Sequence, residues 1–409
     1  MAIELPSTRM NTLAAAWSAF LPLTETDWRE ARKAPDACDF MTGDPQEGPL
    51  AGYVETLQQN LIPERHDWFG YHQGNPEAAE AAAKSLREWC GVPFEPQDIA
   101  LTNGGFGALA ASIRAATDPG DEIIFNLPPW FAYEAMVRDA GAVPVTVHID
   151  RETFDLDLAA IADAITPRTR AVIVNTPHNP TGKIYPPETL ERLALLLDEA
   201  STRYGRAIYI ISDEPYNRIV FDGKRSYTPA EFYPRTFLCY SYGKVLLAPG
   251  ERIGYAALPP TMPERKQMRM ALTLAQASSG YLIPNTVMMY ALPELERMSL
   301  DVEHLQQKRD LLVDELRAIG YSVHRPEATF YLTPESPIDD DWSFARMLAE
   351  EHVYTMPGSM FSLPGYFRLS LTANDQMIER SIPRFKAAFE RAHQEQSATQ
   401  LQAAAGTDD

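Results

Sequence analysis

Cysteine is scarce in this sequence, and its placement excludes two common kinds of structure. Only 3 of the 409 residues are cysteines, and Cys38, Cys90 and Cys239 lie far apart, without a Cys-x-x-Cys pair or a nearby histidine cluster. This spacing indicates neither a disulfide framework nor a zinc site. We therefore expect free thiols in a reducing compartment and no bound metal.

Basic residues and long hydrophobic runs are also in short supply. The chain has 36 Lys and Arg against 56 Asp and Glu, a formal net charge of −20. Nucleic-acid binding depends on basic side chains that neutralise phosphates, so this balance argues against such a partner. No apolar stretch is long enough to cross a bilayer, and the N-terminal residues do not combine a basic region with an apolar run. We therefore expect no nucleic-acid or membrane partner and a cytoplasmic location.

The middle of the sequence carries a strong secondary-structure signal. Between about residues 60 and 260, short β-branched runs alternate with longer helical patterns, such as the leucine-rich stretch 187–200. This alternation is typical of an α/β fold, in which helices cover a mostly parallel sheet. The predicted strands are residues 99–102, 122–125, 144–147, 171–174, 207–212 and 236–240.

The pattern changes after residue 300. A long charged helix at 301–319, short strands at 321–324 and 329–332, and a further helix and strand predict a smaller α+β domain. A length of 409 residues also favours two domains. We expect an N-terminal arm and part of the small domain at 1–55, a large domain at 56–292, the C-terminal small domain at 293–392 and a disordered tail at 393–409.

Four separated segments each follow a predicted strand, where open α/β sheets place their ligands. The first is a glycine-rich turn at 102–109, whose amides at the start of a helix suit a phosphate group. From Gly105 it also reads Gly-x-Gly-x-x-Ala, a dinucleotide-binding pattern. A nicotinamide-dependent oxidoreductase is therefore an alternative, but it leaves the other three segments without a role.

The second and third segments offer an amide and a carboxylate. Asn-Thr-Pro-His-Asn-Pro-Thr-Gly at 175–182 either closes a βα unit as a plain turn or presents the Asn179 amide to a ligand. In Ser-Asp-Glu-Pro-Tyr at 212–216, Asp213 either caps a helix or lies buried opposite a cationic partner. A protonated pyridine nitrogen would be such a partner, and Tyr216 could donate to an oxygen on the same ring.

The fourth segment, residues 241–254, contains a lysine in an unusual place. Most lysines are solvated, but Lys244 directly follows an apolar strand and has apolar neighbours. Desolvation favours the neutral amine that Schiff-base chemistry needs. Ser241 and Arg252 lie on either side of it and suit a phosphate.

Together these motifs resemble the class I/II aminotransferase superfamily of fold-type I enzymes, which use pyridoxal 5′-phosphate (PLP). The resemblance covers residues 40–390 and includes Asn-Pro-Thr-Gly, Ser-Asp-Glu-Pro-Tyr, and Ser-x-x-Lys followed eight residues later by Arg. It implies a seven-stranded type of sheet, a homodimer, and transfer of the α-amino group of an amino acid to a 2-oxo acid.

The resemblance also assigns roles around the ring of the cofactor. Lys244 would form the Schiff base and move the proton, with a pyridoxamine intermediate. Asp213 would pair with the pyridine nitrogen, and Asn179 and Tyr216 would hold the ring's phenolic oxygen. Trp130 would stack on the ring, although an aromatic in this position also suits a core.

Phosphate and substrate contacts follow from the same resemblance. The phosphate would be held by Gly105 and Phe106 amides with Ser241 and Arg252. The substrate would contact Gly43, Asn179 and Arg368, and Arg368 in Gly-Tyr-Phe-Arg-Leu-Ser-Leu would bind its α-carboxylate in a forked geometry.

Two positions depart from the family pattern. Phe106 stands where some aspartate-specific members have a lysine for the distal carboxylate, so this sequence indicates an uncharged, for example aromatic, donor. The family's partner subunit supplies a tyrosine to the phosphate, but Phe69 occupies that position here. Tyr71 is the nearby candidate to replace it.

Other functions on this scaffold remain open from sequence. A PLP-dependent lyase, synthase or amino-acid oxidase would use the same lysine, aspartate and arginine. An aminotransferase-like domain of a transcription regulator would need a DNA-binding module before residue 40, and no basic helix is found there.

Overall fold

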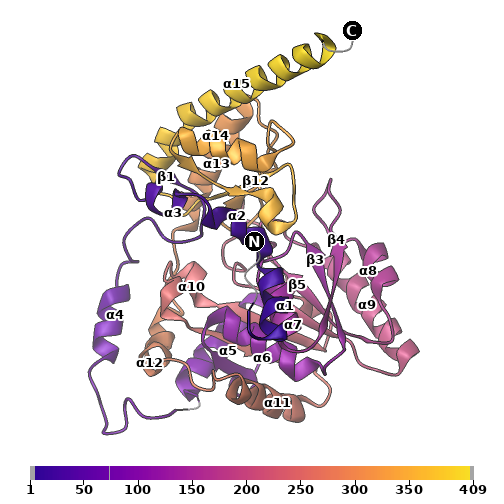
Figure 1. The fold of residues 1–409 in the computed structure, drawn as a ribbon. Helices are drawn as coiled ribbons and strands as arrows, with labels where there is room; N and C mark the ends of the chain where they lie inside the picture. The colour runs from indigo at the N-terminus through magenta and orange to yellow at the C-terminus, as the bar shows by residue number, and fades with distance from the viewer. Residues whose placement is uncertain (1–4, 73, 406–409) are drawn as a thin grey trace.

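A seven-stranded sheet forms the centre of the computed structural model, which describes residues 5–72 and 74–405 (Figure 1). Only β8 is antiparallel to its neighbours, which confirms the mostly parallel sheet predicted from the sequence. Each of the six predicted strands overlaps one of the observed ones. In spatial order the strands are β2 (Ile99–Thr102), β8 (Gly254–Ala257), β7 (Thr236–Ser241), β6 (Tyr209–Asp213), β5 (Thr169–Asn175), β3 (Glu122–Leu127) and β4 (Val143–His148).

Helices cover both faces of this sheet, because successive side chains of a strand point to opposite sides. In β3, Ile123 and Phe125 face α6 (Gly104–Ala116) and α11 (Arg265–Ser278), whereas Ile124 faces α9 (Pro187–Tyr204). The continuous apolar runs of the central strands are therefore buried on both faces. The other helices of the large domain are α4 (Tyr53–Asn60), α5 (Pro76–Cys90), α7 (Tyr133–Asp139), α8 (Leu158–Ala164), α10 (Tyr242–Val245) and α12 (Thr286–Leu295).

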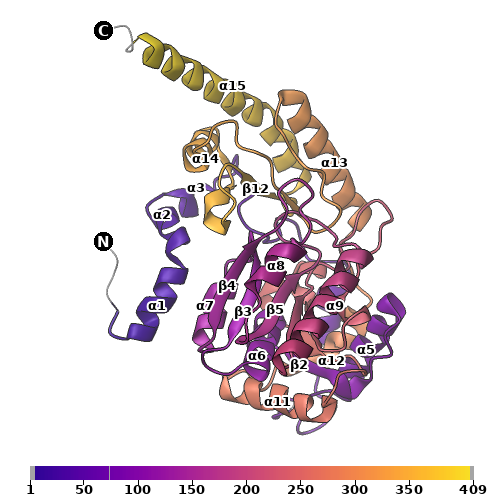
Figure 2. The ribbon, with the colours of Figure 1, turned by 90° about the vertical axis from the view of Figure 1, so that its right-hand side faces the viewer.

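A second, smaller α+β unit lies above the sheet (Figures 1 and 2). Its antiparallel strands have the order β11 (Met356–Pro357), β12 (Phe367–Ser370), β9 (Tyr331–Leu332). They pack with the helices around a core that includes Phe344, Phe367 and Phe385. Its helices are α13 (Val302–Ile319), α14 (Asp341–Glu350) and α15 (Asp375–Ala405).

The N-terminal segment contacts both units. Its helices are α1 (Thr8–Ala16), α2 (Leu21–Thr24) and α3 (Trp28–Ala31), and α1 lies beside α7, where Arg9 pairs with Asp139 (Figure 1). Phe20 and Leu23 pack against Met360 and its neighbours in the small unit. Further along, β1 (Cys38–Asp39) pairs in parallel with β10 (Val353–Tyr354) of the small unit.

Two expectations from the sequence require correction. Residues 393–405 continue helix α15, where a disordered tail was expected, and residues 406–409 lie outside the described part of the chain. The predicted strand 321–324 is reduced to one bridge, Val323 to Pro334. A strand cannot extend far here, because Pro326 lies three residues after Val323 and has no N–H to donate to a neighbouring strand. Within residues 5–72 and 74–405, no helix is long and apolar enough to cross a membrane.

An ion pair joins the two units. The Arg309 side chain on α13 is 1% exposed, and its two terminal nitrogens each donate to a carboxylate oxygen of Asp222 at 2.7 Å. Asp222 lies in the large unit and has φ 59°, a left-handed conformation that asparagine also tolerates. Arg309 Nε also donates to Asp310 Oδ1 at 2.9 Å, so removing Asp222 would leave the buried guanidinium with one of its two carboxylate partners.

Asp222→Asn should therefore lower the free energy of unfolding by about 1–3 kcal/mol, less than for a fully buried pair because Asp222 is partly exposed. Denaturant unfolding would measure the change. Asp314→Asn, which removes an exposed partner of Arg325, is the control and should change it by less than about 0.5 kcal/mol. Equal effects of the two variants would contradict a special role for Asp222.

Candidate active site

The predicted site residues converge on one pocket of about 270 Å³ between the sheet and the small unit. Eleven residues proposed from the sequence line it. These residues are Gly43, Gly105, Phe106, Trp130, Asn179, Asp213, Tyr216, Ser241, Lys244, Arg252 and Arg368. Tyr71 and Phe69 do not line it; they are 96% and 58% exposed on the surface of this chain.

Sheet topology explains the convergence. Strands β5, β6 and β7 are parallel, so Asn175, Asp213 and Ser241 end at one edge. Because β8 runs the other way, the residues before it lie at the same edge, and Gly254 pairs with Ser241. This antiparallel strand therefore brings Arg252 beside Ser241, although eleven positions separate them in the sequence.

Asp213 is a buried carboxylate with few compensating partners. The Tyr133 hydroxyl donates to its Oδ2 at 2.5 Å, and Asn175 Nδ2 donates to the same atom at 3.4 Å. Burial raises the pKa of Asp213 to about 6, against the opposing effects of the Tyr133 hydrogen bond and the Lys244 charge. A cationic group in the pocket would therefore stabilise the ionised carboxylate.

Lys244 presents its amine to the same space. It lies in the short helix α10 directly after β7, and its Nζ lies 5.7 Å from the centre of the Phe330 ring. Among residues 5–72 and 74–405 the amine has no hydrogen-bond or ion-pair partner. Such an amine is available to react with a bound ligand.

Tyr216 adds a neutral hydrogen-bond donor. Its side chain is 3% exposed, and burial raises the pKa of its hydroxyl far above the usual value. The phenol therefore keeps its proton at neutral pH and can donate it in a hydrogen bond.

The first turn of α6 and Arg252 lie side by side at one corner of the pocket. Arg252 Nη1 donates to the Pro249 carbonyl at 2.7 Å, and no carboxylate of the described chain pairs with this guanidinium. A Cβ on Gly104 would lie 2.7 Å from Arg252 Nη2, so glycine is required for this close approach. Amides at a helix start beside an unneutralised guanidinium suit a phosphate.

Arg368 forms a second cationic point, on β12 across the pocket. It is 7% exposed, and Nη2 donates to the Met41 carbonyl at 3.0 Å while Nη1 lies 3.4 Å from Asn179 Oδ1. Its Nε is buried without a partner, and no carboxylate in the described residues pairs with it. A buried guanidinium with a free donor suits a ligand carboxylate.

Several lining or supporting residues were missed by the sequence interpretation. Tyr133, Asn175 and Tyr331 contact predicted site residues: Tyr133 and Asn175 hold Asp213, and the Arg368 guanidinium lies 4.3 Å from the Tyr331 ring centre. Asn175 begins the second motif and could have been found there. Tyr331 explains Gly43, because a Cβ on that glycine would lie 2.6 Å from the Tyr331 hydroxyl.

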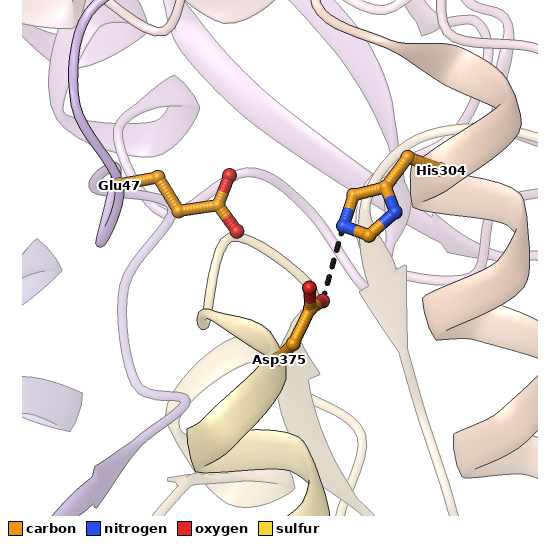
Figure 3. A group of neighbouring side chains, drawn as sticks. All are labelled: Glu47, His304 and Asp375. Carbon is orange, nitrogen blue, oxygen red and sulfur yellow. Dashed lines mark ion pairs between the residues drawn. The ribbon is translucent and has the colours of Figure 1, made fainter.

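A separate polar cluster lies outside this pocket and contains Glu47, His304 and Asp375 (Figure 3). His304 Nε2 is 3.0 Å from Asp375 Oδ1. The nearly buried Lys308 ammonium pairs with Glu47, lies 3.7 Å from Asp375 Oδ1 and donates to the Ala373 carbonyl at 3.1 Å. Lys308 thus supplies positive charge to both carboxylates and ties the segment after Gly43 to α13 and α15.

Lys244, Asp213 and Arg252 lie at one edge of a mostly parallel sheet, and Arg368 of the small unit faces them. This architecture is that of the fold-type I aminotransferases. Comparison with known proteins agrees. The chain belongs to the family described as aminotransferase class I and II, whose sequence model matches residues 35–385. It is therefore a transferase enzyme.

Individual relatives show how close the likeness is. An aspartate/prephenate aminotransferase of Thermus thermophilus is 35% identical over 373 residues, which cover 88% of this chain and 93% of that protein. A crystal structure of an amino transferase from Eubacterium rectale has a TM-score of 0.88 and 31% identity, covering 95% of this chain and all of the other. A Thermus thermophilus aspartate aminotransferase mutant complexed with tryptophan has a TM-score of 0.78 and 29% identity, covering 94% and 100% of the two chains.

Glu214, next to Asp213, is buried and does not line the pocket. Its Oε1 accepts hydrogen bonds of 2.6 Å from the Ser212 and Thr228 hydroxyls. Burial nevertheless raises its pKa from 4.5 to about 8, so the folded protein keeps this proton where the unfolded chain has lost it. Folding stability contributed by Glu214 should be present below pH 4.5 and be lost as the pH rises to about 8.

In the unmodified protein the free energy of unfolding should fall between pH 5 and 8 as Glu214 loses its proton. In Glu214→Gln this fall should be smaller by a few kcal/mol. Denaturant unfolding at several pH values would measure this slope. Glu199→Gln, at an exposed position on α9, is the control and should leave the slope unchanged. An unchanged slope in Glu214→Gln would show that Glu214 does not hold a proton in the folded state.

Proposed function

We propose that this aminotransferase uses PLP and moves the α-amino group of an amino acid to a 2-oxo acid. The observation that supports the proposal is the meeting of Lys244, Asp213, Arg252 and Arg368 in one pocket. The amine matches the aldehyde of PLP, and the buried carboxylate matches its ring nitrogen. The two separated guanidiniums, which pair with no carboxylate of the described residues, match the phosphate of PLP and the carboxylate of an amino acid.

The residues present fit this cofactor. When bound, PLP supplies an aldehyde that captures amines and a protonated pyridine ring that accepts electron density from the substrate Cα. Lys244 would hold the aldehyde carbon and Asp213 the ring nitrogen, with Tyr133 keeping the carboxylate in place. Asn179 and Tyr216 would hold the ring oxygen.

The remaining contacts would fix the two ends of the cofactor and substrate. Arg252, Ser241 and the first amides of α6 would hold the phosphate. Arg368 would orient the substrate so that its Cα proton faces the Lys244 amine. Lys244 would then take that proton as a general base and return one as a general acid.

An aminotransferase differs in its products from a lyase or an amino-acid oxidase with the same fold. The PLP-loaded protein, given an amino acid and no oxo acid, should release one 2-oxo acid per active site and then stop. Continuous release of ammonia would instead indicate a lyase or an oxidase.

Lys244→Ala should reduce transfer by at least about 10²–10⁴-fold, because it removes the residue that moves the proton. It should also remove the absorbance of lysine-bound PLP near the visible edge. Lys266→Ala, at an exposed position, is the control for loss of a lysine charge. Normal turnover by Lys244→Ala would refute the proposed role.

Arg368→Lys should raise the KM for the amino donor by roughly 10²–10³-fold, because a buried carboxylate would lose its forked partner. PLP binding, followed by absorbance, should be unchanged because Arg368 lies at the substrate end of the pocket. Parallel losses of PLP and donor binding would indicate a structural role instead.

A homodimer is part of this proposal. Exposed apolar side chains near residue 70 and on α11 support a second copy as their cover; they include Ile62 (67%), Phe69 (58%), Tyr71 (96%), Met270 (60%) and Leu274 (61%). Tyr71 is then available to the neighbouring active site.

Two donor classes remain candidates. The names of the relatives favour aspartate, a dicarboxylate, as the donor, and prephenate, a 2-oxo acid, as an acceptor. A mutant of a related aspartate aminotransferase is instead complexed with tryptophan, an aromatic amino acid. The charges and the aromatic residues that line the pocket distinguish a dicarboxylate donor from an aromatic one.

A further inference from the structure

We infer that Phe106, with Phe131 and Met356, forms a subsite for the donor side chain that selects aromatic and large apolar amino acids over dicarboxylates. This inference rests on the proposed function, because it concerns the same pocket. It assigns Phe106 as a specificity-determining residue.

Each charged side chain of the pocket already has a proposed partner in the cofactor or in the substrate α-carboxylate. Its lining contains three basic residues, Lys244, Arg252 and Arg368, and one acid, Asp213. The amine and the acid serve the cofactor ring, Arg252 serves the phosphate and Arg368 serves the α-carboxylate. A second substrate carboxylate would therefore be buried here without a cation supplied by the described part of this chain, which is costly.

Part of the uncharged lining is aromatic and apolar, namely Phe106, Trp130, Phe131 and Met356. Phe106, on the first turn of α6, is 45% exposed, and its ring lies edge to face with Trp130 at a centroid distance of 4.6 Å. Trp130 in turn lies 5.2 Å from Phe131, and Met356 completes the lining from the small unit. An exposed aromatic surface beside a ligand pocket gains free energy when an apolar group covers it.

The N-terminal segment holds this wall in place. The Trp17 and Phe20 rings lie 5.3 and 5.1 Å from Phe131, each nearly edge to face. Phe20 also packs against the apolar cluster that contains Met356. Trp17 and Phe20 therefore hold the Phe131 ring in place through contacts with both units. The aromatic side of the pocket is thus formed before a substrate binds.

Binding of substrate analogues tests the inference without catalysis. Titration calorimetry of the PLP-loaded protein with 3-phenylpropionate and with succinate compares one aromatic monocarboxylate with one dicarboxylate. We expect 3-phenylpropionate to bind roughly 10- to 200-fold more tightly. Equal binding, or tighter binding of succinate, would overturn the inference.

Donor kinetics give a second test, using phenylalanine, aspartate and alanine. The kcat/KM of the unmodified protein should favour phenylalanine over aspartate by roughly 10- to 200-fold. Failure with all three donors would instead count against the proposed function. If alanine reacts and aspartate equals or exceeds phenylalanine, only the present inference fails.

Two substitutions at one position separate charge from shape. Phe106→Lys supplies the missing cation and should shift the phenylalanine-to-aspartate ratio toward aspartate by at least tenfold. Phe106→Leu, the matched uncharged control, should reduce phenylalanine use without increasing aspartate use. If Phe106→Lys does not fold, Phe131→Ala should lower the ratio through loss of the aromatic wall. An unchanged ratio in the folded variants would overturn the assignment.

Discussion

The arrangement of the site depends on one constraint, the burial of the Asp213 carboxylate at the end of β6. Burial penalises its charge, and within the described part of the chain the Tyr133 hydroxyl, the Asn175 amide and the nearby Lys244 amine offset that penalty. A buried anion with so little compensation favours a cationic ligand group opposite it. The burial that raises the pKa of Asp213 is thus the same burial that a protonated ring nitrogen would offset by pairing with the carboxylate.

At the two ends of the pocket, two cationic side chains likewise favour ligand groups of the opposite charge. The chain carries 20 more acidic than basic side chains, yet Arg252 and Arg368 pair with no carboxylate in residues 5–72 and 74–405. Elsewhere in the protein, buried arginines such as Arg309 are neutralised. Because both guanidiniums line the pocket, a bound ligand can supply the negative charge that they lack.

The pocket also depends on two units meeting in a fixed relation. Asp213, Lys244 and Arg252 come from the sheet, whereas Arg368 and Met356 come from the small unit. The Arg309–Asp222 pair and the N-terminal segment join the two units, and Phe20 and Trp17 reach the pocket wall itself. Contacts between the two units thus set the distance between Arg252 and Arg368.

The sequence by itself determined the α/β class, six strands of the sheet, and 11 of the residues that line the pocket. This was possible because Asn179, Asp213 and Lys244 each follow a strand within a short motif, so local order fixes their place. Strand β8 was not predicted, since Gly-Tyr-Ala-Ala at 254–257 has no β-branched residue. The helix at 393–405 was missed because its residues show no apolar periodicity.

Only the tertiary structure decided the contacts between distant segments. The Tyr133 bond to Asp213, the Arg368 stack on Tyr331 and the bracing of Phe131 by Trp17 join residues that are 80, 37 and 114 positions apart. Such contacts arise from how helices and strands pack, and packing depends on shape and burial across the whole chain. Short motifs encode a local turn, whereas the partners of each side chain are set by the assembled core.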